Sequence, residues 1–205
     1  MVHAQLSPNW RDAKIIHDIS GLEAVQKRPG MYVGEPGPLR FLRCIGLIVN
    51  KFVYASTKPA QWGRPRFPDH GILRVGGAGQ KVEIVLAAGA VDTDDTNDRW
   101  QTLFRPMDAL ICGGRNDLTI LNALTDKLSI AFWKDGAWTN LSEETEATQA
   151  KRNEQRGGVH LWAAMTFGEQ VPACGVSQDL IHGYLEGIRE KWVGLVIDDI
   201  KYGAT

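Results

Sequence analysis

The chain has 205 residues, of which 43% are hydrophobic and 23% charged, as expected for a globular protein with a substantial core. Its 23 Lys and Arg against 24 Asp and Glu give a net charge of −1, which excludes a generally basic surface for nucleic acid. Three distant cysteines have neither disulfide nor zinc-site spacing and favour a cytoplasmic setting. Residues 1–20 are expected to form a polar arm unlike a signal peptide, and residues 21–205 one domain without a membrane span.

The segment GLEAVQKRPGMYVG, residues 21–34, has the most particular residue order in the chain. It begins with a short amphipathic stretch that is typical of a helical turn. Lys27 and Arg28 then precede a Pro29–Gly30 pair. Proline fixes φ and glycine permits positive φ, so the pair predicts a forced turn with two basic side chains beside it. Met31–Val33 is expected to be a short strand.

Leu39–Ala55 keeps apolar residues at helical spacing and is predicted to be a helix buried on most sides. Residues 57–71 are rich in Pro, Gly and Arg and are predicted to be an irregular loop. Basic and aromatic side chains in such a loop can contact phosphates and stack on bases, although a surface loop anchored by its aromatic residues is the simpler interpretation. The residues concerned are Lys58, Trp62, Arg64 and Arg66.

Two strands are predicted next, Ile72–Val75 and Lys81–Ala87, with the glycine-rich turn GGAGQ between them. The segment DTDDTND, residues 92–98, concentrates acids that are able to bind calcium. It lacks the central glycine and terminal glutamate of an EF-hand loop, so a solvated loop is the better interpretation.

The second half of the chain alternates helical and strand patterns. The predicted elements are a helix within residues 100–112, helical spacing over Leu118–Leu128, strands at 128–133 and 138–141 joined by a turn at 134–136, a polar loop at 142–156, a strand at 158–165, a helix from the cap Ser177 to Glu190, and a strand at 193–200. This order predicts an α+β fold: a two-layer sandwich with helices on one face of a mixed, mostly antiparallel sheet.

Three segments together resemble one known family. GLEAVQKRPGMYVG resembles the start of the ATPase domain of DNA gyrase B and its GHKL (Bergerat-fold) relatives. DLTILNALTDKLSI, residues 117–130, is similar to the family's helix after the ATP lid, and GGVHLW, residues 157–162, to a late strand. The resemblance extends from about residue 15 to the C-terminus and implies the same α+β fold.

The family's chemistry needs a glutamate and, four residues later, an asparagine on one helix face. The glutamate orients the attacking water and the asparagine holds magnesium. The resemblance places Asn50 at the magnesium position and Gly46 at the general-base position. There is no carboxylate between Glu35 and Asp69 to replace the missing base.

Other nucleotide contacts of the family are missing too. In its Asp-x-Gly-x-Gly turn the aspartate binds adenine; here Gly77 and Gly79 are kept, but the aspartate position is assigned to Gly76. Losing such a charged acceptor weakens adenine binding about ten- to a hundredfold. The lid that wraps the phosphates is reduced to GGRN, residues 113–116, and the threonine that supports the aspartate is a glycine at residue 157 or 158.

These losses indicate a gyrase B-like pseudo-ATPase that acts as a protein-binding, regulatory or complex-assembly module. We expect no catalytic residue, no metal ligand and no cofactor, with Asn50, Gly77 and Gly79 as vestiges of a nucleotide site. Lys27, Arg28, Pro29 and Tyr32 are the candidates for contact with a protein partner. The resemblance implies a gyrase or topoisomerase subunit, or a second copy joined through the N-terminal arm.

Two alternatives remain open. The chain is either a divergent Mg-ATP-binding subunit of a topoisomerase-like or other complex, with Asp69, Glu83 or Asp108 as replacement acids, or a nucleic-acid-binding module that uses the loop at residues 57–71. ATP turnover that depends on Asn50 favours the first, and a salt-sensitive DNA complex favours the second.

Overall fold

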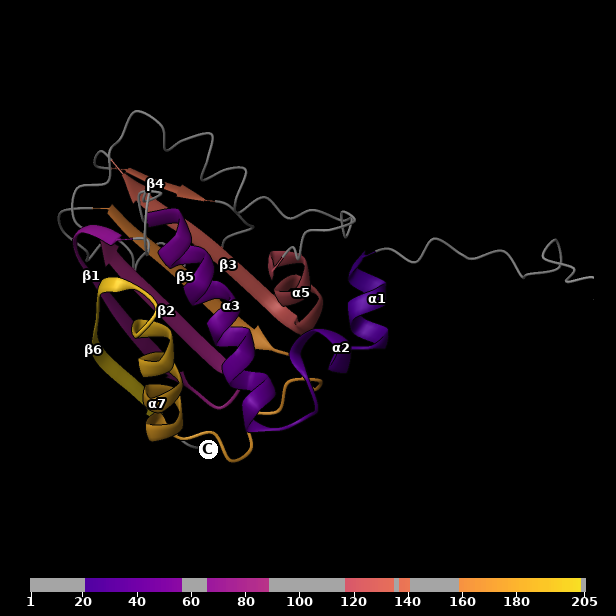
Figure 1. Ribbon diagram of the computed structural model, residues 1–205. Helices are drawn as coiled ribbons and strands as arrows, with labels where there is room; N and C mark the ends of the chain where they lie inside the picture. Colours follow the sequence, from indigo (N-terminus) through magenta and orange to yellow (C-terminus); the bar gives the residue numbers. More distant parts are fainter. Residues whose placement is uncertain (1–20, 57–65, 89–116, 135–136, 141–158, 204–205) are drawn as a thin grey trace, which may run out of the picture.

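The computed structural model describes residues 21–56, 66–88, 117–134, 137–140 and 159–203 (Figure 1). The N-terminal arm, the acidic and lid segments and the polar loop all lie outside these ranges. The described elements are α1 (Gly21–Lys27), α2 (Gly30–Val33), α3 (Pro38–Ser56), β1 (Arg66–Ala78), β2 (Lys81–Ala88), α5 (Asp117–Leu124), β3 (Thr125–Lys134), β4 (Ala137–Asn140), β5 (Val159–Phe167), α7 (Gln178–Arg189) and β6 (Val193–Gly203).

The strands form one six-stranded sheet in the order β4-β3-β5-β2-β1-β6. Within the described residues, β1 and β6 pair in parallel and all other neighbours pair antiparallel. α3 lies across the middle of one face of this sheet, and α7 lies beside α3 over the β1–β6 side of the same face (Figure 1). α1 and α2 lie beside α5 at one end of the sheet (Figure 1). The predicted α+β sandwich with a mixed, mostly antiparallel sheet is therefore confirmed.

The core lies between α3 and the sheet, where the helical and strand periodicities meet. Alternate residues of β2 and β5 face the helices and are in register, as in the pairs Ile84↔Ala163 and Leu86↔Leu161. Phe41 of α3 is fully buried and packs edge-on against Phe167, with ring centroids 4.9 Å apart. This packing fixes which face of α3 is left for other contacts.

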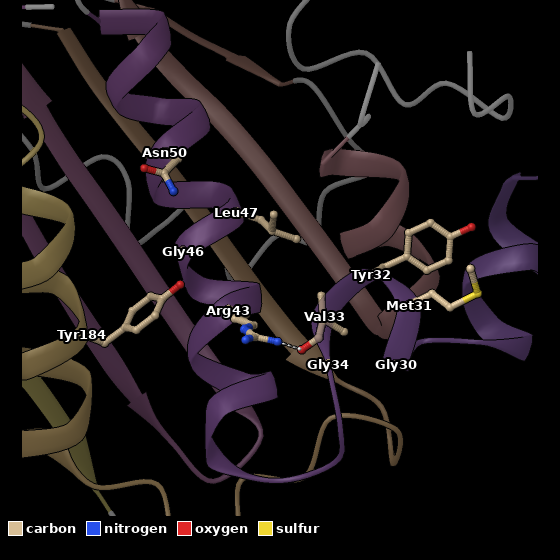
Figure 2. Close-up of a pocket in the computed structure, with 10 residues that line it drawn as sticks. All are labelled: Gly30, Met31, Tyr32, Val33, Gly34, Arg43, Gly46, Leu47, Asn50 and Tyr184. Atoms are coloured by element: carbon tan, nitrogen blue, oxygen red, sulfur yellow. Dashed lines mark hydrogen bonds between the residues drawn. The ribbon is translucent and has the colours of Figure 1, made fainter. Parts of the chain in front are cut away.

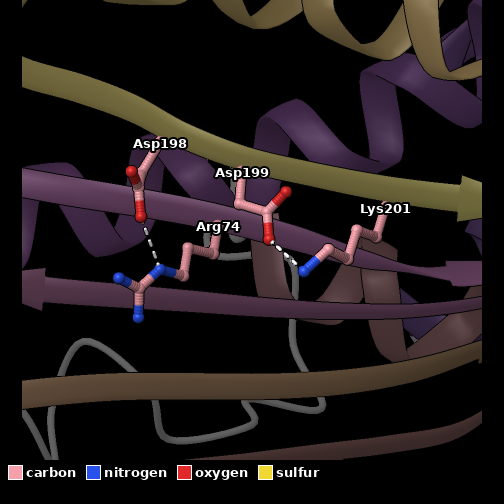
Figure 3. Close-up of polar contacts among 4 residues, drawn as sticks. All are labelled: Arg74, Asp198, Asp199 and Lys201. Atoms are coloured by element: carbon pink, nitrogen blue, oxygen red, sulfur yellow. Dashed lines mark hydrogen bonds and ion pairs between the residues drawn. The ribbon is translucent and has the colours of Figure 1, made fainter.

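Charged side chains mark the β1–β6 pair at the edge of the sheet. The register shifts between Leu73 and Arg74, which makes Asp198 an extra residue in β6. Arg74 Nε contacts Asp198 at 2.8 Å, and Lys201 Nζ contacts Asp199 at 2.7 Å (Figure 3). Such exposed pairs add little stability, but a bulge and charges on an edge strand discourage pairing with another sheet.

The largest departure from the sequence prediction is in the opening segment. Residues 31–33 form the helical turn α2 and not a strand, because Pro29 adopts helical angles (φ −59°, ψ −30°) and its carbonyl accepts the Val33 N–H at 2.9 Å. Positive φ is found at Gly34 (81°) and not at Gly30. A proline at the start of a helical turn and a glycine after its end are the favoured arrangement for a helix.

Three other boundaries differ. β1 begins at Arg66, inside the predicted loop, and Pro68 is tolerated there because the β1–β6 register is irregular between Arg66 and Gly71. The β1–β2 turn consists of Gly79 and Gln80, since β1 continues to Ala78. The helix predicted over Leu118–Leu128 ends at Leu124, and β3 starts at the next residue.

The predicted N-cap of α7 is confirmed, since the Ser177 hydroxyl accepts the Leu180 N–H at 3.2 Å. The pairing of β3 with β4 is also as expected. Across the parts of the chain that the structure covers, no helix is both long and apolar enough to span a membrane.

The two described cysteines differ sharply in environment. Cys44 on α3 is buried, and burial raises the pKa of its thiol from 9.0 to about 12, although the nearby Arg40 acts in the opposite direction. Cys174 is exposed. Because the folded state holds this thiol neutral, its contribution to the free energy of unfolding is fully present below pH 9.0. That contribution is lost as the pH rises towards 12.

We therefore expect the free energy of unfolding to fall above about pH 9, by at most about 1.4 kcal/mol per pH unit from this thiol. Urea denaturation between pH 7 and 10 measures the slope. Cys44→Ala is expected to reduce this slope. Equal slopes in the wild-type protein and the variant would contradict the assignment.

Candidate functional site

The opening segment is fixed to α3 by two arginines. Arg40 is only 4% exposed, and its Nε and Nη1 donate to the carbonyl oxygens of Gly34 (2.8 Å) and Gln170 (2.7 Å). Arg43 Nη1 donates more weakly to Val33 O at 3.4 Å. Its guanidinium lies where a side chain on Gly34 would be, but this flexible, exposed arginine side chain can move, so the glycine is required by its positive φ.

A cavity of about 430 Å³ lies between this segment, α3 and α7 (Figure 2). Its lining consists of Gly30, Met31, Tyr32, Val33, Gly34, Arg43, Gly46, Leu47, Asn50 and Tyr184. The structure thus brings Asn50 and Gly46, the two positions that correspond to the family's catalytic pair, to one cavity. Sequence reasoning missed Arg40, Arg43 and Tyr184. The available signal for the two arginines was the presence of two cations in the otherwise apolar first half of α3.

The space in front of Gly46 is filled by Tyr184. The Tyr184 hydroxyl points from α7 towards Gly46 (Figure 2), and a Cβ atom there would lie 2.5 Å from the hydroxyl oxygen and 3.1 Å from ring Cζ. Real Cβ atoms do not come so close, so any side chain at this position requires Tyr184 to move. Burial raises the pKa of Tyr184, with Arg43 acting in the opposite direction, so the hydroxyl is protonated at neutral pH.

The asparagine at the magnesium position also has a partner within the protein. Asn50 Oδ1 accepts the indole N–H of Trp192, which follows α7, at 3.4 Å. An asparagine binds magnesium through this same oxygen. The carboxamide is therefore oriented by Trp192, while its NH₂ group faces the cavity region.

Gly77 and Gly79 are not part of this site. Gly79 lines a separate cavity of about 970 Å³. Gly175 lines that cavity too and approaches Pro38, the first residue of α3. Asn50 lies twelve residues further along the helix, which is about 18 Å at 1.5 Å per residue. The predicted vestigial set of Asn50, Gly77 and Gly79 is thus divided between two ends of α3.

The sheet also shows that the two adenine-related assignments do not fit together. The residue that would support the adenine-binding aspartate is expected at position 157 or 158, immediately before β5 in the sequence. Val159, the first residue of β5, pairs with Ala88 at the end of β2. Gly76 lies towards the other end of the sheet, paired with Glu83 and Lys201. A residue supported from the start of β5 would stand near Ala88 and not at Gly76. Neither Gly76 nor Ala88 is itself an acid, although Glu83 is the cross-strand neighbour of Gly76. The absence of an adenine acceptor therefore stays a prediction.

The candidate partner residues lie at the rim of the same region. Lys27 and Arg28 are exposed, and Lys27 forms an i,i+4 ion pair with Glu23 at 2.6 Å. Pro29 begins α2. Tyr32 is half-buried, packs against the core and lines the cavity. Their role in binding a partner stays a prediction.

The residues of the two alternatives are mostly beyond the described ranges. These include Lys58, Trp62, Arg64 and Asp108, and no side chain is described for Arg66 or Asp69. Glu83 is described, and its Oε1 accepts the Trp162 indole N–H at 2.6 Å. Among the described residues no group of three or more His, Cys, Asp or Glu is arranged to hold a metal ion.

The contact between Tyr184 and Gly46 predicts an energetic coupling. Gly46→Ala gains about 1 kcal/mol of helix propensity but forces Tyr184 to move, which costs about 1–3 kcal/mol. With Tyr184→Phe the closest atom is absent, so the same substitution is expected to be better tolerated. A double-mutant cycle by urea denaturation should give a coupling of about 1 kcal/mol; a coupling near zero would show that Tyr184 does not restrict the position.

Comparisons with known proteins agree with this architecture. No protein-family model matches the chain. The chain is 26% identical over 155 residues to the DNA gyrase B protein of Mycobacterium tuberculosis, and equally to that of Mycobacterium bovis; each match covers 65% of this chain. The chain spans about a fifth of the length of these relatives, 21% and 20%.

Among solved structures, the 43K ATPase domain of Thermus thermophilus gyrase B, in complex with an aminocoumarin, matches with a TM-score of 0.53. The match has 14% identity and covers 88% of this chain and 49% of that one. Identity at this level shows the fold alone. The described part of the chain therefore has the fold of a gyrase B-like ATPase domain.

Proposed function

We propose that this gyrase B-like domain does not hydrolyse ATP and serves as a protein-binding module. The proposal rests chiefly on the position where the family carries its general base. Gly46 supplies no carboxylate there, and Tyr184 fills the space that a carboxylate would need. A general base contributes roughly 10²–10⁴-fold to the rate, so its absence alone makes turnover negligible.

Two further observations support the same conclusion. Asn50 Oδ1 is engaged by Trp192, and a magnesium ion would have to displace that indole N–H. Among the described residues, neither Gly76 nor Ala88, the last residue of β2, is itself an acid that could accept a hydrogen bond from the adenine amine. The general-base, magnesium and adenine positions are thus all affected. Several independent changes of this kind are more consistent with loss of selection for catalysis than with a single change that another residue compensates.

A binding role is supported by what has been kept. The fold is intact, and the opening segment is fixed to α3 through Arg40 and Gly34 although the chemistry it introduces is missing. The similar proteins are named as subunits of DNA gyrase, which supports a gyrase-like or topoisomerase-like subunit, or a second copy of this chain, as the partner. A cytoplasmic location belongs to this proposal.

The catalytic half of the proposal is tested by a coupled ATPase assay on the full chain with magnesium. We expect a rate equal to the buffer blank, and the same rate for Asn50→Ala. Turnover that is lost on Asn50→Ala would overturn the proposal in favour of a divergent ATPase. Turnover that Asn50→Ala leaves unchanged would also contradict it and would place the catalytic groups elsewhere.

The binding half is tested by sedimentation velocity, with the chain alone over a concentration range and mixed with gyrase subunits from the same source. A complex with itself or with one of those subunits is expected. Arg28→Ala, at an exposed residue, should weaken that complex, with Lys191→Ala, in the exposed turn after α7, as the control. A strictly monomeric chain that leaves the gyrase proteins unbound would contradict the proposed partners.

A further inference from the structure

We propose that the cavity between α2, α3 and α7 binds a carboxylate, supplied by an acidic side chain of the partner protein. The inference rests on the proposed binding function and names the chemistry that this site recognises. It concerns Arg43, Tyr184 and Asn50, whose polar groups all face the cavity between these helices (Figure 2).

The cavity lining is rich in donors and has no acid. Arg43 uses one N–H for Val33 O, at 3.4 Å, and the rest of its guanidinium is available. Within the described residues, the Tyr184 hydroxyl and the Asn50 NH₂ group have no hydrogen-bond acceptor, and none of the ten lining residues is Asp or Glu. Three donors that face one half-exposed cavity favour an anionic or carbonyl oxygen ligand over a cationic one.

The local charge favours an anion as well. Arg43 forms no ion pair with any described acid. The buried Arg40 guanidinium, which donates to the carbonyl oxygens of Gly34 and Gln170, lies next to Gly30 and Gly34 of the lining. Buried charge is poorly screened, so it adds to the positive potential of the site. Glu35 opposes this, since its carboxylate approaches Gly30, but it is exposed and outside the lining. The glutamate that the family carries at the position of Gly46 would repel an anion in this cavity. Gly46 has no side chain and does not repel one.

A carboxylate fits better than phosphate groups. One available cation balances one carboxylate, and a guanidinium binds its two oxygens side by side. A triphosphate would leave several charges unbalanced, because no lysine lines the cavity and the magnesium position is engaged by Trp192. Met31 is 69% exposed at the rim and adds an adaptable apolar surface beside the cation. A protein partner can pack on such a surface, whereas a free anion gains nothing from it.

The experiment is a titration of the isotope-labelled full chain, followed by amide and side-chain NMR shifts. The probe is the peptide acetyl-Leu-Glu-Leu-amide, and the same peptide with glutamine is its control. Sodium acetate, inorganic phosphate and Mg-ATP are titrated separately. Arg43→Gln and Tyr184→Phe test the site, and Lys191→Gln, the same charge change at an exposed residue outside the cavity, is the matched control.

We expect shifts at the cavity residues with the glutamate peptide and weaker shifts with acetate, while the glutamine peptide leaves them unmoved. Arg43→Gln should weaken peptide binding about ten- to a hundredfold, Tyr184→Phe several-fold, and Lys191→Gln hardly at all. Equal binding by Arg43→Gln, no shifts with any carboxylate, or tighter binding of phosphate would each overturn the inference. Cavity shifts with Mg-ATP that disappear in Asn50→Ala would contradict the proposed function instead, so the two failures are distinguishable.

Discussion

Gly77→Ala is expected to lower the free energy of unfolding by about 3 kcal/mol or more. Gly77 has φ 145°, a conformation that L-residues rarely adopt, and an added Cβ would overlap the Lys81 carbonyl oxygen across the β1–β2 pair. That oxygen belongs to the backbone of the next strand, so relief requires a shift of the hairpin. The glycine is therefore required by the sheet itself, without reference to a nucleotide.

The neighbouring glycine provides the control. Gly76 lies in the same strand, has no positive φ, and a Cβ there would find its nearest atom, Lys201 O, at 3.9 Å. Gly76→Ala should stay within about 0.5 kcal/mol of wild type, or be slightly more stable, because alanine loses less entropy on folding. Urea denaturation of both variants measures the difference, and similar stabilities would contradict the hairpin geometry.

Arg40→Met is expected to destabilise the protein by about 3 kcal/mol. Arg40 is almost fully buried, and its loss leaves the carbonyl oxygens of Gly34 and Gln170 without their donors. Methionine replaces most of the apolar stem, so the missing hydrogen bonds dominate the change. The opening segment should also separate from α3, which hydrogen exchange at the α2 amides would detect as faster exchange.

Arg43→Met is the matched control one helical turn later. Arg43 is exposed and makes only the long contact with Val33 O, so we expect a change within about 0.5 kcal/mol. Equal losses for the two variants would contradict the distinct roles assigned to the two arginines. The two substitutions also separate stability from binding. Arg43 is expected to contribute to carboxylate binding, and Arg40 to the free energy of unfolding.

Much of the fold could be predicted from the sequence because periodicity specifies it. The alternation in β2 and the apolar stripe of α3 lie where burial decides the structure, and both are confirmed. The errors occurred where backbone geometry or pairing decides. Residues 31–33 are apolar in either conformation, and only the helical angles of Pro29 select a turn of helix. β1 begins early because β6 pairs with it from Arg66, a contact between segments distant in sequence.

The candidate site was predicted only in part. Spacing placed Gly46 and Asn50 on one helix face, and the structure places both at one cavity. Spacing gave no information about Tyr184 and Trp192, which reach these positions from α7 and the residues after it. The assignments at Gly76 and at residue 157 or 158 do not fit together, because a short glycine motif does not reveal which end of a sheet it occupies.

The opening segment is accounted for without ATP. Pro29 starts α2, Gly34 ends it with positive φ, and the carbonyl of Gly34 accepts from buried Arg40. These contacts give GLEAVQKRPGMYVG a structural role in the fold.

The most direct measurement of the central claim is the melting temperature of the wild-type chain with and without saturating Mg-ATP. A ligand at a hundred times its Kd stabilises the native state by about 2.7 kcal/mol, which for a domain of this size is roughly 5–10 °C. The pseudo-ATPase proposal predicts no shift beyond that given by magnesium and a non-binding nucleotide control such as UMP. A rise of several degrees that Asn50→Ala abolishes would contradict it.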